Sequence, residues 1–153
     1  MKFIKLLWAC GIAMFLVVLV ATICSYLEID TSWYEGLKLL AFVPSVTAMS
    51  ILWAFNYCMH IFVLTRAVLQ RISVIKTLLL VFVEIFWIGF YVSFWHFHNV
   101  GIALAMLAML VIYMVVVGIF VLKCDSWCVV WLCVEIAIIC YLATSFFWQF
   151  YIG

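Results

Sequence analysis

Long apolar runs separated by short polar segments constrain the fold of this chain more than any other feature. A helix needs about 20 apolar residues to cross the hydrocarbon core of a bilayer. Hydrophobic residues make up 73% of the 153 residues and charged residues only 8%, which is too little charge for a water-soluble surface. The sequence therefore predicts an all-α integral membrane protein, a five-transmembrane-helix bundle that forms a single membrane domain over residues 1–153.

The positions of the predicted crossings follow from where the apolar runs begin and end. The runs lack the alternation of apolar and polar residues that a transmembrane β-barrel requires, so helices are expected. Short connections make neighbouring helices antiparallel. A more polar segment, residues 28–44, is expected to fold over one end of the bundle as a lid. The predicted spans are residues 3–27, 45–69, 75–95, 101–122 and 126–151.

The distribution of positive charge predicts the orientation of the chain. With five crossings, the amino terminus and the second and fourth loops lie on one side of the membrane. The side of the amino terminus carries six basic residues, Lys2, Lys5, Arg66, Arg71, Lys76 and Lys123. The opposite side carries only Lys38. Basic loops favour the cytoplasm. We therefore expect a multi-pass protein with a cytoplasmic amino terminus and an outward carboxyl terminus.

Ionisable residues inside the predicted spans are the sharpest local features. Glu84 and Glu135 each interrupt an apolar run. A carboxylate at membrane depth is costly and usually faces the bundle interior. The two residues form a candidate proton or polar site, and the equal alternative is a protonated carboxyl bonded to a neighbouring helix. His60, in the second span, is expected to be an interior hydrogen-bonding residue.

The histidine and cysteine pattern does not predict a metal site. His96 and His98 could hold a metal or a haem iron, but solvated turn residues are the favoured interpretation. Cys124, Cys128 and Cys133 cluster without a third ligand at metal spacing, so all seven cysteines are interpreted as reduced packing residues. We expect no obligatory cofactor, and no basic run suggests binding to nucleic acid.

The segment after the first predicted crossing carries a motif. Residues 33–45 read WYEGLKLLAFVPS, and a tryptophan follows in the second span. The pattern W-Y-x-x-L-x-K-P-x-W-x-P-P, followed by such a tryptophan, is typical of the TspO/MBR family, the tryptophan-rich sensory and translocator proteins. From residue 29 onward the chain resembles this family, and the agreeing positions are Trp33, Tyr34, Leu37, Pro44 and Trp53.

Two later segments extend the resemblance. Residues 94–106 read FWHFHNVGIALAM, which is similar to the family run F-F-G-x-x-N-x-G-x-A-L-V-D. Residues 142–144, Leu-Ala-Thr, are similar to a Phe-Ala-Thr stretch near the end of the family. The family aspartate is replaced by Met106, and a family pocket tryptophan is replaced by Ile139.

The resemblance implies a function and a site. Family members are five-helix bundles, often homodimers, that bind porphyrins or haem in a pocket under the first loop. We therefore expect a receptor or translocator-type protein that binds a tetrapyrrole, and no enzyme, because Ile139 replaces one of the tryptophans tied to porphyrin breakdown. Aromatic walls and a polar rim suit such a ligand. The implied ligand-binding residues are Trp33, Tyr34, Leu37, Pro44, Trp53, Phe90, Phe94 and Ala143.

Two other functions stay open at the level of sequence. One is a proton-coupled small-molecule transporter that uses Glu84 and Glu135, and the other is a structural membrane subunit that binds no ligand. A single tryptophan is more often an interface anchor or a packing residue than a ligand contact. A cavity beneath the 28–44 loop, faced by Trp33 and Trp53, would favour the ligand-binding function. A filled bundle without a cavity would favour the structural subunit.

Overall fold

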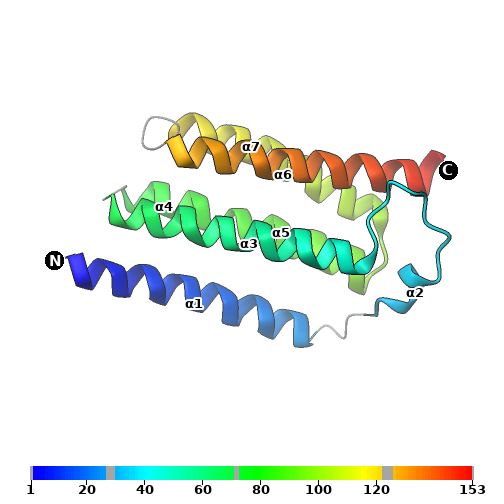
Figure 1. Ribbon diagram of the computed structural model, residues 1–153, viewed down its shortest axis with the longest axis horizontal. Coiled ribbons are helices and arrows are strands. Elements are labelled where there is room, and N and C mark those ends of the chain that lie inside the picture. The colour runs from blue at the N-terminus through cyan, green and yellow to red at the C-terminus, as the bar shows by residue number, and fades with distance from the viewer. Residues whose placement is uncertain (1, 27–29, 71–72, 122–125, 153) are drawn as a thin grey trace.

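The computed structural model describes residues 2–26, 30–70, 73–121 and 126–152. Figure 1 shows long helices running side by side, with the two termini at opposite ends of the molecule. The short elements η1 and η2 are π-helical turns. In chain order the elements are α1 (Lys2–Tyr26), α2 (Ser32–Glu35), α3 (Val46–Leu69), α4 (Val74–Val81), α5 (Val83–Tyr91), η1 (Val92–His96), α6 (Val100–Val121), α7 (Ser126–Phe147) and η2 (Trp148–Ile152).

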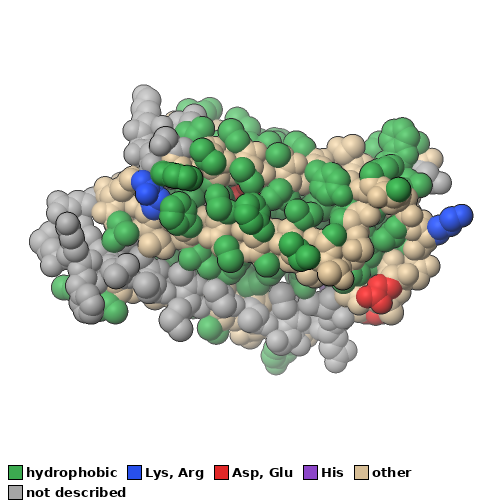
Figure 2. Space-filling model, in the orientation of Figure 1, with side chains coloured by type: hydrophobic (Ala, Val, Ile, Leu, Met, Phe, Trp, Pro, Cys, Tyr) green, Lys and Arg blue, Asp and Glu red, His purple; other side chains and the backbone are tan. Residues whose placement is uncertain are grey.

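Four helical stretches within the described residues are long and apolar enough to cross a membrane. They are Val46–Arg66, Ile75–His96, Val100–Phe120 and Val129–Ile152. These stretches agree with the predicted all-α membrane class and with four of the expected spans. Figure 2 shows apolar side chains over the flank of the bundle and charged side chains near its ends, as a lipid environment requires.

Three crossings begin at a residue that caps the helix. The Ala48 amide donates to Ser45 Oγ at 3.2 Å before α3, and the Ile102 amide donates to Asn99 Oδ1 at 3.0 Å before α6. Ser73 caps α4 in the same way. A side-chain oxygen at this position satisfies an amide that has no partner within the helix. Polar residues between the apolar runs thus mark where α3, α4 and α6 start.

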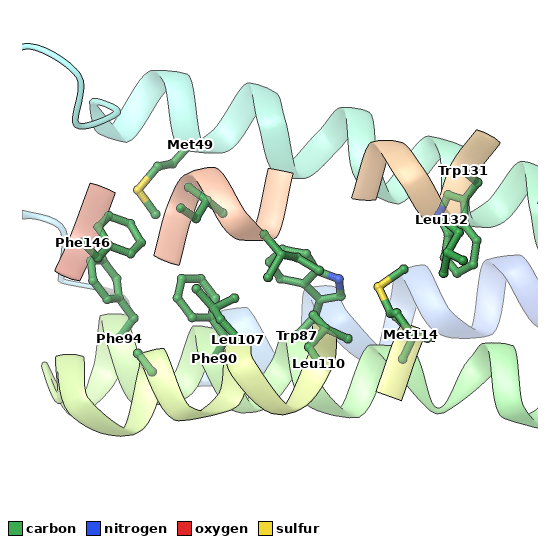
Figure 3. Packing of buried hydrophobic residues seen from close by; sticks show 14 of the residues in the cluster. Met49, Trp87, Phe90, Phe94, Leu107, Leu110, Met114, Trp131, Leu132 and Phe146 are labelled. Carbon is green, nitrogen blue, oxygen red and sulfur yellow. The ribbon is translucent and has the colours of Figure 1, made fainter. Parts of the chain in front are cut away.

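The four membrane-crossing stretches form a closed ring. The helix α3 packs against α4 and α7, α5 packs against α6, and α6 packs against α7, while α1 lies along α3 outside this ring. Figure 3 shows large side chains filling the interior, among them Trp87, Phe90 and Phe146. At Gly118 on α6 an added Cβ would lie 2.4 Å from Leu132 Cδ2 on α7, so a larger residue there would force the Leu132 side chain to shift.

The predicted third crossing is not one continuous helix. It is interrupted at Phe82 between α4 and α5, and it ends in the π-helical turn η1. Around the interruption, the Leu79 carbonyl accepts from the Tyr113 hydroxyl at 2.7 Å and the Leu80 carbonyl accepts from His60 Nε2 at 2.9 Å. Backbone groups at membrane depth need such partners. Side chains from α3 and α6 therefore stabilise a break that neither proline nor glycine explains.

The segment that contains α2 folds over one end of the ring, and we call residues 30–44 the lid. The Tyr34 hydroxyl donates to the Pro44 carbonyl at 2.7 Å, which closes the lid on itself. The Leu40 amide donates to Gln149 Oε1 at 3.0 Å, which joins the lid to η2. Figure 1 places α2 at the end of the molecule opposite the amino terminus. The lid thus covers the mouth of the bundle.

Candidate functional site

A cavity of about 140 Å³ lies beneath the lid, between α3, α5 and α7. It is comparable in size to an engineered cavity of about 150 Å³ that binds benzene. Its walls are mainly apolar and aromatic with a few polar groups, which is typical of small-molecule sites. The lining residues are Thr31, Val46, Met49, Ser50, Leu52, Trp53, Asn56, Trp87, Phe90, Tyr91, Trp95, Ile138 and Leu142.

Trp53 forms part of one wall of this cavity. Its ring stacks on Tyr57, with centroids 5.6 Å apart and planes 12° apart, and it lies 5.6 Å from the ring of Tyr91. Tyr57 is one turn along α3, whereas Tyr91 comes from α5. Contacts on two helices hold the indole in a fixed position, so the cavity has a preformed flat face.

Of the ligand-binding residues that the family resemblance implied, some line the cavity and others do not. Trp53 and Phe90 line the cavity. Tyr34 and Phe94 are fully buried, with ring centroids 5.6 Å apart, in a packed cluster beneath the lid. Trp33 is half-buried against the same cluster, 5.4 Å from the ring of Phe94, and does not line the cavity.

The remaining implied residues lie outside the cavity lining. Leu37 and Ala143 are half-buried and pack against the hydrophobic core, and Pro44 is buried at the end of the lid. Trp95 belongs both to the aromatic cluster and to the cavity wall. The cluster therefore adjoins the cavity through Trp95, whereas Trp33 contacts the cluster and not the cavity.

Two titratable groups of the lid have shifted pKa values. Burial raises the pKa of the Tyr34 hydroxyl, so it stays protonated and continues to donate to the Pro44 carbonyl. The pKa of Asp30 is lowered, chiefly because its carboxylate accepts hydrogen bonds from the Ser32 hydroxyl and the Ser32 amide. The lowered pKa of Asp30 favours the lid conformation at neutral pH, where the carboxylate that accepts from Ser32 is ionised.

A buried carboxyl group lies behind the inner wall of the cavity. Asn56 Nδ2 donates to Glu135 Oε1 at 3.2 Å, and Trp87 Nε1 donates to the same oxygen at 2.7 Å. Both donors line the cavity. Glu135 has 0% exposure, and its second oxygen, Oε2, has no hydrogen-bond partner among the described residues. One carboxyl thus joins α3, α5 and α7 through a single oxygen.

A second polar pair lies one turn deeper. His60 Nε2 donates to the Leu80 carbonyl at 2.9 Å, and His60 Nδ1 contacts Glu84 Oε1. A carbonyl only accepts, so Nε2 must carry a proton, and a second proton must lie between Nδ1 and the carboxyl. The pair has no net charge in either arrangement of that proton. The ring of Trp131 stacks on His60 at 5.2 Å and covers it.

The other histidines and the cysteines form no metal site in the described part of the chain, where no three His, Cys, Asp or Glu side chains are grouped to hold an ion. His96 and His98 are exposed beside the turn after η1, and the ring of His98 packs 4.7 Å from Trp33. Cys124 and the side chain of Cys128 lie outside the described residues. Cys133 is a free thiol on the surface.

Sequence reasoning identified parts of this polar network but not its connections. It grouped Glu84 and Glu135 as one candidate site, treated His60 separately, and gave no role to Asn56 or Trp87. A signal was present, because Asn56 and His60 are four residues apart and Glu84 and Trp87 are three apart. Residues at these spacings share one face of a helix. Polar residues that share a face within an apolar span indicate an interior site.

No protein-family model, curated protein or solved structure matches this chain. The class of the protein is therefore described from its fold and its site alone. It is a helical protein with membrane-crossing helices, an aromatic-walled cavity beneath a lid and a buried carboxyl behind the cavity wall.

Proposed function

We propose that this protein is a membrane receptor or translocator that binds a tetrapyrrole, such as a porphyrin or a haem-like molecule, in the cavity beneath the lid. The observation that carries the proposal is the position of Trp53 in the wall of that cavity. Trp53 is also the tryptophan that completes the TspO/MBR-like motif. A flat macrocycle would stack on such aromatic faces, which favour offset or edge contacts with other rings.

The size of the cavity determines how such a ligand would enter. At about 140 Å³ the cavity holds one ring of a macrocycle, so a complete tetrapyrrole requires a wider mouth. Thr31 of the lid lines the cavity, which makes the lid the segment to be displaced. Its link to η2 through Leu40 and Gln149 is a hydrogen bond that can open without unfolding a crossing.

The proposed arrangement in the membrane includes α1 as a fifth crossing. Its 25 residues would extend about 37 Å, which exceeds the hydrocarbon core of about 30 Å. The basic loops support a cytoplasmic amino terminus. Since the lid lies at the opposite end from that terminus, the cavity opens outward. Ligand is therefore captured from the outer side.

The test is a titration of protoporphyrin IX into purified protein in lipid nanodiscs, followed by porphyrin absorbance. Trp53→Ala should weaken binding at least about fivefold, because loss of a central aromatic contact worth about 1 kcal/mol or more raises Kd by that factor. Trp127→Ala is the matched control, since Trp127 is exposed near the start of α7 and does not line the cavity. If Trp53→Ala and the wild type bound protoporphyrin IX with equal affinity, the cavity would not be the binding site.

A second variant tests the cavity by blocking it. Ser50 is exposed and lines the cavity, and among the described residues its hydroxyl bonds only to the Val46 carbonyl of its own helix. Ser50→Trp should therefore fold and should abolish protoporphyrin binding. Indole serves as a single-aromatic probe in the same assay. Binding of indole without binding of protoporphyrin would keep the cavity as a ligand site and overturn the tetrapyrrole class.

A further inference from the structure

A histidine from the turn between η1 and α6 contacts the lid. The imidazole ring of His98 lies 4.7 Å from the ring of Trp33, measured between centroids. A cation within roughly 6 Å of an indole centroid is attracted to the ring. Trp33 is also the residue through which the lid packs on the bundle, because its ring contacts Phe94 of η1 and Phe150 of η2. His98 thus touches the main packing residue of the lid.

The backbone at His98 adopts an unusual conformation. Of the non-glycine residues that the structure describes, only His98 has a positive φ, which is 50°. This left-handed region is unfavourable for a residue with a Cβ, although histidine occupies it more often than most. The turn is held by the Asn99 amide, which donates to the Ser93 carbonyl at 2.8 Å. Strained positions that the surroundings fix in this way cluster at switch regions.

A carboxylate of the lid interacts with the same imidazole. Hydrogen bonds from the Ser32 hydroxyl and amide are the main reason that the pKa of Asp30 is lowered, and the charge of His98 lowers it further. The carboxylate of Asp30 therefore stays ionised in mild acid, whereas histidine is the side chain that ordinarily gains its charge between pH 8 and pH 5. A protonated His98 lies beside an anion and an aromatic ring of the lid at once.

Other charges around the turn act in both directions. Glu35 adds negative charge to the lid, and its carboxylate accepts from the Thr31 hydroxyl at 3.4 Å. Lys38 and His96 have the opposite sign, but both are exposed, so water and salt screen them. His98 follows the carboxyl end of η1, which favours a cation, and precedes the amino end of α6, which disfavours one. The tyrosines of the lid and of η2, Tyr34 and Tyr151, are neutral in this pH range.

We propose that His98 is a pH-sensitive switch for the lid: when its imidazole takes up a proton, the imidazolium is attracted to the Trp33 ring and to the Asp30 carboxylate and holds the lid closed over the cavity. The proton comes from water at the lid end of the bundle and returns to it when the pH rises. Stronger acid protonates Asp30 and removes one of the two attractions, so the lid is most stable in mild acid. The inference goes beyond the proposed function, because it concerns access to the cavity for any ligand.

The test is amide hydrogen exchange of the lid in ligand-free protein in lipid nanodiscs, at pH 7.5 and pH 5.5. The intrinsic exchange rate changes with pH, so each variant is compared with the wild type at the same pH. His98→Asn cannot titrate, and asparagine tolerates a positive φ, so the turn is kept. The lid amides of His98→Asn should exchange faster than those of the wild type, and this ratio of rates should be about two- to fivefold larger at pH 5.5 than at pH 7.5.

Two further variants separate His98 from its neighbours. His96→Gln is the matched control, because it removes the other exposed histidine of this end of the bundle, and it should not reproduce the increase in the ratio. Asp30→Asn removes the anion and leaves the contact with Trp33. In the Asp30→Asn background the effect of His98→Asn should therefore shrink without disappearing. Unchanged exchange in the crossings shows that each variant has folded.

The outcomes distinguish the inference from the proposed function. A rate ratio for His98→Asn that is equal at both pH values would overturn the inference, and so would an equal increase in His96→Gln. Neither result depends on a ligand, so porphyrin binding would still stand. Failure of the wild type to bind protoporphyrin IX would overturn the proposed function and would leave the switch unaffected.

Discussion

His60 and Glu84 contact each other in the interior of the bundle, and the same imidazole donates to the Leu80 carbonyl at 2.9 Å. Leu80 precedes the helix interruption at Phe82, and Glu84 follows it. One side chain of α3 therefore spans the break in its neighbour. The stability of the interrupted crossing depends on a residue of another helix.

Replacing His60 by alanine should destabilise the bundle strongly. Glu84 and the Leu80 carbonyl would both lose a buried partner, and breaking a buried pair on one side costs about 3–5 kcal/mol. The free energy of unfolding, measured by SDS titration in mixed micelles, should fall by that order. Ile51→Ala is the control, because Ile51 is exposed on the same helix and its loss should change little.

The double variant sharpens that prediction. His60→Ala combined with Glu84→Ala should cost less than the sum of the two single changes, because the second change removes the group that the first leaves unpaired. Strict additivity would contradict the direct pairing of these two residues.

Gly118→Ala should destabilise the contact between α6 and α7. The new Cβ would lie 2.4 Å from Leu132 Cδ2, and overpacking of this kind costs about 1–3 kcal/mol. Gly11→Ala is the matched control, since nothing lies within 4 Å of its added Cβ and alanine favours a helix by up to about 1 kcal/mol. Thermal unfolding in detergent should therefore shift in opposite directions, and equal shifts would contradict the packing at Gly118.

Tyr34→Phe should loosen the lid. The change removes the buried hydrogen bond to the Pro44 carbonyl, and leaving a buried acceptor without its partner costs about 1–3 kcal/mol. Amide hydrogen exchange in the lid should accelerate while the crossings keep their protection. Tyr141→Phe removes a comparable bond to the Phe42 carbonyl from an exposed side chain, where water can replace it, so a smaller effect is expected.

The lid should also loosen in acid. The pKa of Asp30 is lowered in the folded protein by its hydrogen bonds to Ser32, so its contribution to stability is present above its unfolded pKa of about 3.9 and is lost as the pH falls through the lower folded value. Hydrogen exchange of the lid amides between pH 7 and pH 3 measures this loss. Asp30→Asn still accepts a hydrogen bond but does not titrate, and an identical acid response in that variant would exclude Asp30 as the cause.

The positions of the crossings could be predicted from sequence because the hydropathy pattern is strong. The predicted spans 45–69 and 101–122 differ by at most one residue at either end from α3, Val46–Leu69, and α6, Val100–Val121. Capping residues such as Ser45 and Asn99 mark these ends in the sequence itself. The order of the long helices along the chain could therefore be predicted from the sequence.

The break at Phe82 and the polar network could not be predicted in the same way. Neither depends on local sequence, because the partners His60 and Tyr113 come from α3 and α6. In a chain this apolar, lipid-facing and interior faces look alike, since lipid is as apolar as a protein core. The sequence therefore does not reveal which face of each helix points into the bundle. For the same reason it does not predict the hydrogen bonds of Asn56 and Trp87 to Glu135.

The ring of helices closes between α3 and α7, which are the first and the last of its members along the chain. Asn56 and Trp87 are therefore synthesised well before their shared acceptor, Glu135. A nascent or truncated chain that lacks α7 carries both donors into the bilayer without that acceptor. The wall of the cavity is therefore complete only after α7 has packed against α3, because both donors meet their shared acceptor at that step.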